Sequence, residues 1–145
     1  MRDTPWILGE RVTHHLLISM ATIFTIHGGF STAITLYFLI LGVWGFVRAI
    51  RGQQVDGNYL GGLVIVEVLI IIQGILGTAL WVAGNNANVT RFEIHLLYGV
   101  FGVIFLPFVY MVMLRGDTSN RGQWVLSFTS LFLFGIALRA IATSI

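Results

Sequence analysis

The stretch "FTIHGGFSTAITLYFLILGVWGFVRAIRG" (residues 24–52) decides how this 145-residue chain folds. Within it, residues 28–47 are mostly apolar and carry no charge before Arg48 and Arg51 end the run. A helix of about 20 apolar residues crosses the roughly 30 Å hydrocarbon core of a bilayer. The stretch therefore predicts a transmembrane helix that has one histidine, His27, beside its first turn.

Three further apolar stretches of similar length follow, at about residues 60–83, 95–114 and 124–144. The whole chain is 57% hydrophobic and only 10% charged, whereas an ordinary soluble domain is about 25% charged. Short connections make consecutive spans antiparallel neighbours. We therefore expect an all-α fold, an integral membrane up-down four-helix transmembrane bundle that forms a single membrane domain over residues 1–145.

Residues 12–26 extend the first apolar stretch toward the N-terminus. A single helix over residues 16–47 would be about 48 Å long at 1.5 Å per residue, which is too long for the hydrocarbon core. We expect residues 12–26 to form an interfacial or protruding helical extension. The pair Gly28 and Gly29 is the expected position of a kink between this extension and the first span.

The arginines give a small orientation bias. Positively charged residues are retained on the cytoplasmic side of a membrane. Arg48, Arg51, Arg115 and Arg121 follow the first and third spans. The other side holds Arg2, Arg11 and Arg91, plus Arg139 about one and a half turns inside the end of the fourth span. This count of four against three or four predicts a multi-pass protein with both termini outside, and we expect its membrane to be the bacterial cytoplasmic (inner) membrane.

Composition also excludes several classes of function. The chain has no cysteine, which excludes disulfides, thiolate zinc sites, iron–sulfur clusters and covalent c-type haem attachment. The sequence pI of about 9.5 does not indicate nucleic-acid binding, because no basic stripe with interleaved aromatic residues is present. Phosphate-loop, dinucleotide-binding and zinc-protease motifs are also missing. The expected partners are the lipid bilayer and other membrane subunits.

Two histidines are predicted to lie at the same depth. Counting about 20 residues back from the arginines that end the first and third spans reaches Gly28 and His95. His27 and His95 are therefore expected on the same side of the membrane, with Arg139 of the fourth span at a similar level. Such a pair is the minimal axial ligand set of a b-type haem, with the arginine on a propionate.

A structural reading of the same residues competes with haem ligation. A neutral histidine at the headgroup boundary needs no metal, because it can bond to water or to a backbone carbonyl. Arg139 can likewise pair with Glu93, which lies just before the third span on the same side. Both readings stay open at the level of sequence.

Glu67 and Gln73 are the polar residues inside the second span. A carboxylate there costs a few kcal/mol unless it is protonated or paired. Glu67 is either a proton-carrying or quinol-contacting group, or a neutral acid bonded to a hydroxyl such as that of Ser127, Thr129 or Ser130. Gln73 is expected to donate a hydrogen bond to a neighbouring helix.

The four-span layout, with "IHGG" (26–29) opening the first span and "IHLLYG" (94–99) opening the third, resembles known electron-transfer proteins. It is similar to small membrane subunits of bacterial electron-transfer complexes and, more loosely, to four-helix b-type cytochromes. The resemblance implies His27 and His95 as haem ligands. Two-haem members usually place a second histidine pair toward the other face, which this chain lacks, so at most one haem is implied.

Three functions follow from these observations. The first is a small accessory or anchoring subunit of a larger respiratory or photosynthetic electron-transfer complex, more a non-catalytic subunit of an oxidoreductase than an enzyme. The alternative is a single-haem b-type membrane cytochrome that transfers electrons to or from a quinol, so that haem b and quinone are the candidate cofactor and partner. The third is a small oligomeric transporter or proton pathway that uses Glu67.

Overall fold

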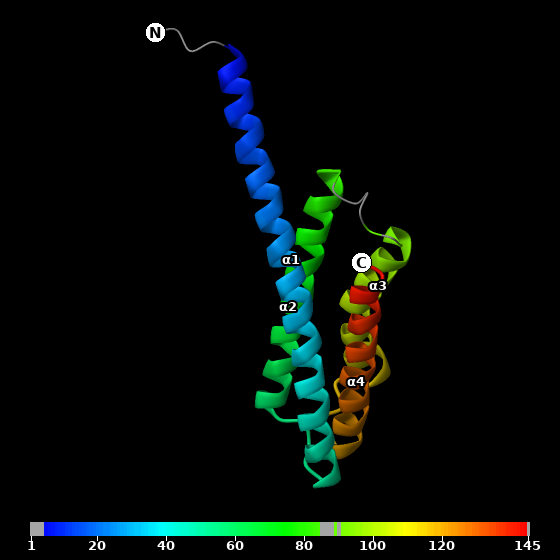
Figure 1. Ribbon diagram of the computed structural model, residues 1–145. Helices are drawn as coiled ribbons and strands as arrows, with labels where there is room; N and C mark the ends of the chain where they lie inside the picture. The colour runs from blue at the N-terminus through cyan, green and yellow to red at the C-terminus, as the bar shows by residue number, and fades with distance from the viewer. Residues whose placement is uncertain (1–4, 85–88, 90, 145) are drawn as a thin grey trace.

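The computed structural model describes residues 5–84, 89 and 91–144, with side chains from residue 18 onward. The elements in chain order are α1 (Pro5–Ile50), α2 (Gly57–Val82), α3 (Phe92–Phe108), a π-helical turn η1 (Val109–Met113) and α4 (Asn120–Ala142). Figure 1 shows them as an up-down bundle. All four helices are long and apolar enough to cross a membrane, so the all-helical, four-helix prediction is confirmed.

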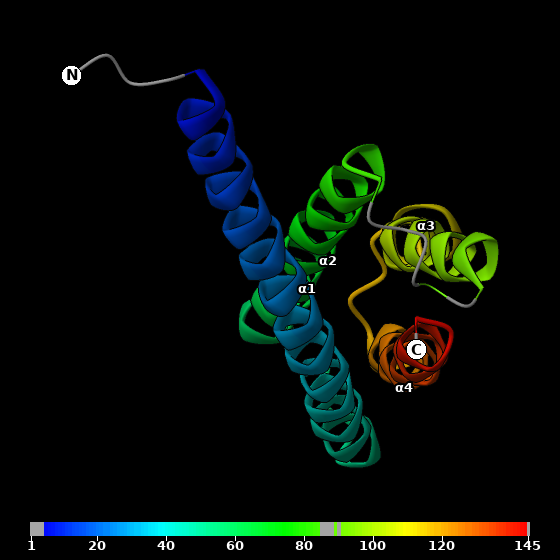
Figure 2. The ribbon, with the colours of Figure 1, turned by 45° about the horizontal axis from the view of Figure 1, so that its top comes forward.

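The four helices form a ring of neighbours. Among the residues that the structure describes, α1 contacts α2 and α4, and α3 contacts the same two helices, so α1 and α3 lie diagonally opposite one another. Figure 2 shows that α1 and α2 cross, whereas α3 and α4 run side by side. In Figure 1 the α1–α2 pair and the α3–α4 pair are close at the bottom and separate toward the top.

Helix α1 corrects the expected break at Gly28 and Gly29. It is one uninterrupted helix of 46 residues, about 69 Å long at 1.5 Å per residue, and its first turns protrude beyond the other helices in Figure 1. Helical geometry continues through both glycines, because glycine permits a kink but does not require one. Nothing lies within 4 Å of where a Cβ would stand on either glycine. The side chains of residues 12–17, and those of Arg2 and Arg11, lie outside the described part.

The packed core occupies the lower half of the bundle in Figure 1, which we call the closed half. It contains residues 34–55 of α1 and the following loop, 59–70 of α2, 106–114 of α3 and η1, and 126–133 of α4. Large side chains fill it, among them Phe38, Tyr59 and Leu126, each no more than 1% exposed. Burial of large apolar groups from all four helices holds this half together.

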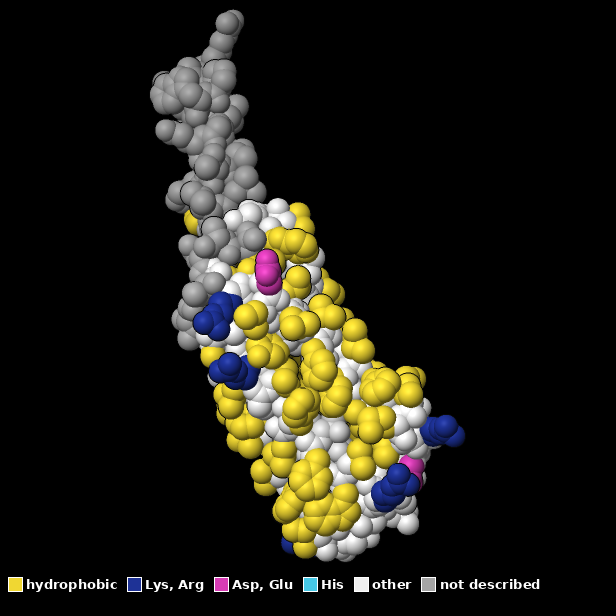
Figure 3. Space-filling view, turned by 90° about the vertical axis from the view of Figure 1, so that its right-hand side faces the viewer, with side chains coloured by type: hydrophobic (Ala, Val, Ile, Leu, Met, Phe, Trp, Pro, Cys, Tyr) yellow, Lys and Arg dark blue, Asp and Glu magenta, His cyan; other side chains and the backbone are white. Residues whose placement is uncertain are grey.

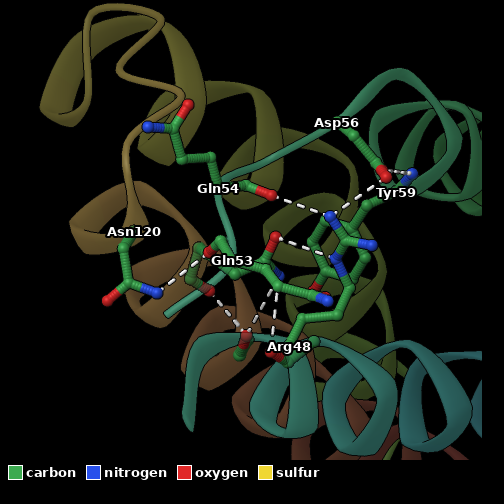
Figure 4. Close-up of polar contacts among 9 residues, drawn as sticks. Arg48, Gln53, Gln54, Asp56, Tyr59 and Asn120 are labelled. Atoms are coloured by element: carbon green, nitrogen blue, oxygen red, sulfur yellow. Dashed lines mark hydrogen bonds and ion pairs between the residues drawn. The ribbon is translucent and has the colours of Figure 1, made fainter. Parts of the chain in front are cut away.

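A polar cluster seals the end of the closed half (Figure 4). Arg48 of α1 pairs with Asp56 at 3.0 Å, donates to the Gln54 carbonyl at 2.7 Å and reaches the side-chain oxygen of Gln123 at 3.5 Å. The amide of Asn120 donates to main-chain carbonyls of α1 and the following loop. These contacts fix the α1–α2 loop against the start of α4.

Asp56 also caps α2. Its carboxylate accepts a bond from the Tyr59 main-chain N–H at 2.9 Å, which satisfies one of the donors left free at the start of a helix. This N–H, and then the charge of Arg48, hold the pKa of Asp56 below its usual range. The buried hydroxyl of Tyr59 donates to the Leu41 carbonyl, so the loop, the cap and the core are joined through one residue.

The outer surface is apolar along all four helices. Exposed large hydrophobic residues include Ile40, Val64, Ile75, Ile104 and Phe128. In Figure 3 hydrophobic side chains cover the middle of one face, and charged side chains lie toward its two ends. An apolar surface of this extent is unusual for a protein in water, and it is what contact with lipid tails requires.

Candidate functional site: a cleft between two histidines

The upper half of the bundle in Figure 1, which we call the open half, contains a cleft of about 1120 Å³. All four helices line it. Small-molecule and cofactor sites typically occupy about 300–1,000 Å³, so the cleft is large enough for a sizeable cofactor. Its lining is mostly apolar and includes the imidazoles of His27 and His95 and the phenol of Tyr98.

His27 and His95 meet inside this cleft, although α1 and α3 are diagonal helices. Their ring centres are 6.2 Å apart and the ring planes are inclined by 63°. The expectation that the two residues lie at the same level of the bundle is confirmed. The pairing requires that neither α2 nor α4 place a large side chain between them.

His95 is held in a defined tautomer by α4. Its Nδ1 lies 2.8 Å from the carbonyl oxygen of Ala140. A carbonyl only accepts hydrogen bonds, so Nδ1 carries the proton and Nε2 carries the free lone pair. Ala140 lies in the last turn of α4, where main-chain carbonyls lack a helical donor and can accept bonds from other groups.

His27 is held by α2. The amide of Gln73 donates to the main-chain carbonyl of His27 at 2.9 Å and to the hydroxyl of Ser31. The imidazole edge lies against Gly77, where a Cβ would stand 3.1 Å from the Cε1 atom of His27. Nδ1 of His27 is buried and has no hydrogen-bond partner within the described part of the chain.

Small residues surround the two rings. Each helix contributes some of them to the cleft: Gly28 from α1, Gly74 and Gly77 from α2, Gly99 and Gly102 from α3, and Ala137 and Ala140 from α4. Small side chains let a flat molecule approach the backbone, and they also leave the space that forms the cleft. The same residue types serve helix packing elsewhere in membranes, but most of these glycines have nothing within 4 Å to pack against.

The separation of the rings suits two axial ligands of one metal ion. Metal–imidazole bonds of about 2 Å on opposite sides of a metal put the two ring centres about 6 Å apart. The described residues contain no group of three or more His, Cys, Asp or Glu side chains that could hold a metal ion. A haem brings its own four equatorial nitrogens and needs only two axial ligands, so the pair fits a haem better than a bare ion.

Arg139 lies next to the site without lining it. It precedes Ala140 in α4, and its side chain is exposed and is not among the residues that line the cleft. The expected ion pair between Arg139 and Glu93 does not form. Among the described residues, Arg48 and Asp56 make an ion pair, whereas Glu93 and Arg139 are both exposed and unpaired with one another. The pairing of Arg139 with a propionate stays a prediction.

The two polar residues of α2 have different surroundings. Gln73 donates to α1, as predicted for an interhelical hydrogen-bond donor. Glu67 lies in the closed half, outside the cleft lining, and its buried Oε2 has no partner among the described residues. The hydroxyls of Ser127 and Ser130, two of its expected partners, donate instead to carbonyls of their own helix.

Sequence reasoning missed two groups that hold the histidines. Gly77 is four residues after Gln73 and therefore on the same face of α2, a spacing that was visible in the sequence. The Ala140 carbonyl has no side-chain signature, because any residue presents the same group. The signal in the sequence is the position of Ala140 in the last turn of α4, where carbonyls can accept bonds from side chains. The Ala140 carbonyl accepts from the Thr143 hydroxyl as well as from His95.

Comparison with protein-family models, with curated proteins and with solved structures found no match to this chain. The geometry of the cleft therefore carries the functional argument.

Proposed function

We propose that this chain is a single-haem b-type membrane cytochrome in which His27 and His95 are the axial ligands. The observation that carries the proposal is the 6.2 Å separation of the two imidazole centres inside a large apolar cleft. The Ala140 carbonyl adds to it, because it directs the proton of His95 to Nδ1 and leaves Nε2 free for a metal. A haem held in this way exchanges one electron at a time.

A lipid-soluble quinol is the proposed electron partner. The residues that line the cleft include Ile75, Val100 and Ile104, whose apolar side chains are each at least half exposed. A molecule dissolved in the bilayer can therefore approach the cleft from the side without crossing a polar surface. The apolar lining favours a carrier with a hydrocarbon tail over a water-soluble one.

The chain is proposed to work in the cytoplasmic membrane of a bacterium, with both termini outside, as a small subunit of a larger energy-converting complex. This role is compatible with haem binding, because a cytochrome of this size can be one subunit of such a complex. Co-purification from mild detergent tests it directly. A stable assembly of fixed composition supports a subunit, whereas a chain that isolates alone contradicts it.

A reduced-minus-oxidised absorption spectrum of the purified chain tests the haem. The expected result is a b-type α band that is lost in both His27→Ala and His95→Ala. His15→Ala is the matched control, because residue 15 precedes His27 by about 18 Å along the helix at 1.5 Å per residue. A featureless spectrum from a folded helical preparation, or a band that survives in either cleft variant, contradicts the proposal.

A further inference from the structure

We infer that Gln73 and Gly77 of α2 together position the imidazole of His27, so that a helix without a ligand determines how one axial ligand meets the haem. The inference rests on the proposed function and assigns roles within the same cleft. Gln73 bonds to the main chain of His27, and the ring of His27 lies nearest to where a Cβ of Gly77 would stand. They are positioning residues, because they act on the haem through His27.

Gln73 holds the backbone of His27. Its Nε2 donates to the His27 carbonyl at 2.9 Å and to the Ser31 hydroxyl, which itself donates to the same carbonyl at 3.0 Å. Two side chains, one from α1 and one from α2, thus donate to one main-chain oxygen and are bonded to each other. This triangle fixes the height of His27 on α1 relative to α2, and the remaining polar atom of Gln73, Oε1, is buried.

Gly77 sets the direction of the ring. It lies one helical turn beyond Gln73 on the same face of α2. The Cε1 atom between the two ring nitrogens of His27 is the nearest atom to where a Cβ of residue 77 would stand, at 3.1 Å, and the two nitrogens are each 3.9 Å from it. A methyl group at this position is tighter than ordinary van der Waals contact and would push the ring toward the interior of the cleft.

The two ligands are supported in the same manner by different helices. Helix α4 holds His95 through a carbonyl that bonds the ring, and α2 holds His27 through an amide that bonds the backbone and a glycine that admits the ring. Groups that orient a metal ligand typically change metal affinity by about 10- to 100-fold when they are removed. His95 is bonded at its ring, so His27 is the ligand that depends on the fit against a neighbouring helix.

The test compares Gln73→Leu and Gly77→Ala with Gly61→Ala. Gly61 lies on α2 outside the cleft lining, and a Cβ there meets nothing within 4 Å, so its variant reports the general effect of altering the helix. We expect Gln73→Leu and Gly77→Ala to bind haem about 10-fold more weakly than the parent. Both should also lose part of the six-coordinate low-spin spectrum and gain a form that binds carbon monoxide. Gly61→Ala should match the parent.

A measurement without haem isolates the effect on the ligand. In the haem-free protein, ¹⁵N spectra of the histidine rings should change for His27 in Gln73→Leu and remain the same for His95. Far-ultraviolet circular dichroism shows whether each variant is folded, and Gly77→Ala gives an independent result if Gln73→Leu does not fold.

The outcomes separate the inference from the proposed function. If the parent chain takes up no haem, the proposed function fails and the inference with it. If the parent binds haem through both histidines while Gln73→Leu and Gly77→Ala retain its affinity, spin state and carbon monoxide resistance, the proposed function stands and the inference is overturned. Equal changes at His27 and His95 would also overturn it, because they would indicate general loosening of the bundle.

Discussion

The closed and open halves of the bundle are built from the same four helices, yet their interiors differ. In the closed half, large side chains such as Phe38 and Tyr59 fill the centre, and Arg48 and Gln123 are bonded to one another and to the backbone. In the open half, glycines line a cleft and Nδ1 of His27 has no partner among the described residues. The chain therefore places its packing in one half and its candidate site in the other.

The difference between the two halves comes from the size of the side chains that face the interior, and α2 shows it most clearly. Helix α2 presents Tyr59, Leu63 and Val66 to the core in its first half, and Gly74 and Gly77 to the cleft in its second half. In a bilayer, lipid tails compete with side chains for apolar contact, so helices associate through close packing and polar bonds. Where small residues leave space without close packing, the bundle depends on a bound molecule or on the other half for its stability.

The largest predicted effect compares two phenylalanines of α1. Phe38 is 1% exposed in the core, and its replacement by alanine should lower the free energy of unfolding by about 3–5 kcal/mol because it leaves a cavity. Phe24 is 61% exposed in the open half, and Phe24→Ala should change it by less than about 0.5 kcal/mol. Unfolding in detergent, followed by circular dichroism, measures both. Similar losses would mean that the two halves do not differ in packing.

The next prediction adds a methyl group to each half. A Cβ on Gly45 would collide with the hydroxyls of Tyr59 and Ser127, so Gly45→Ala should lower the free energy of unfolding by about 1–3 kcal/mol. A Cβ on Gly29 would meet nothing within 4 Å, so Gly29→Ala should leave the free energy of unfolding unchanged or raise it by up to about 1 kcal/mol. Thermal unfolding of both variants under one detergent condition provides the measurement. A tolerated alanine at residue 45 would show that the closed half has room to adjust.

Glu67 is the exception inside the closed half, and it offers a sharper test. Its buried Oε2 has no partner among the described residues, and an unpaired buried polar group costs about 1–3 kcal/mol. Glu67→Leu should therefore raise the free energy of unfolding by about 1–2 kcal/mol. This is less than the full cost of an unpaired buried group, because the Glu67 side chain is only half-buried. Leu69→Val on the same helix serves as a control for altered packing. A less stable Glu67→Leu protein would mean that the carboxyl has a partner and that the closed half has a second polar site.

The smallest effect concerns the ion pair at the closed end. The pKa of Asp56 is held below its ordinary value of 3.8, first by the Tyr59 N–H and then by Arg48. A lowered folded-state pKa gives stability that is present above pH 3.8 and is lost as the pH falls through the folded value. The parent should lose unfolding temperature below about pH 4 more steeply than Asp56→Asn, which keeps the helix cap without the charge.

Asp117 must be controlled in this experiment. Its pKa is also lowered, by the Ser119 N–H, so part of the acid sensitivity belongs to it. The double variant Asp56→Asn, Asp117→Asn should show the flattest dependence on pH. An identical pH dependence in the parent and in both variants would rule out these carboxylates as its source.

Much of this architecture can be predicted from hydropathy along the sequence and from the length of helix that crosses a bilayer. The predicted spans at residues 28–47, 60–83, 95–114 and 124–144 fall within the observed helices α1, α2, α3 with η1, and α4 to within two residues, because hydropathy and bilayer thickness determine where a helix can cross. The common level of His27 and His95 followed from counting residues back from the arginines, since position along a helix measures depth. The approach of their rings to 6.2 Å depends on how the four helices are arranged and did not follow from that count.

Other features depend on which helix faces which, and a single sequence carries little information on that. The bond from His95 to the Ala140 carbonyl needs the registry of α3 against α4. The continuous course of α1 through Gly28 and Gly29 could not be predicted, because glycine permits a kink in a helix without requiring one. One of the two readings of Glu67 paired it with a hydroxyl of α4, but the hydroxyls of Ser127 and Ser130 bond within their own helix.

Titration of the haem-free protein with haemin tests whether the open half holds one haem between His27 and His95. Binding should saturate at one haem per chain, with a six-coordinate low-spin spectrum and a rise in unfolding temperature as the cleft fills. Absence of saturation, or a high-spin spectrum that is unchanged in His27→Ala and His95→Ala, would show that no haem is held between the two histidines.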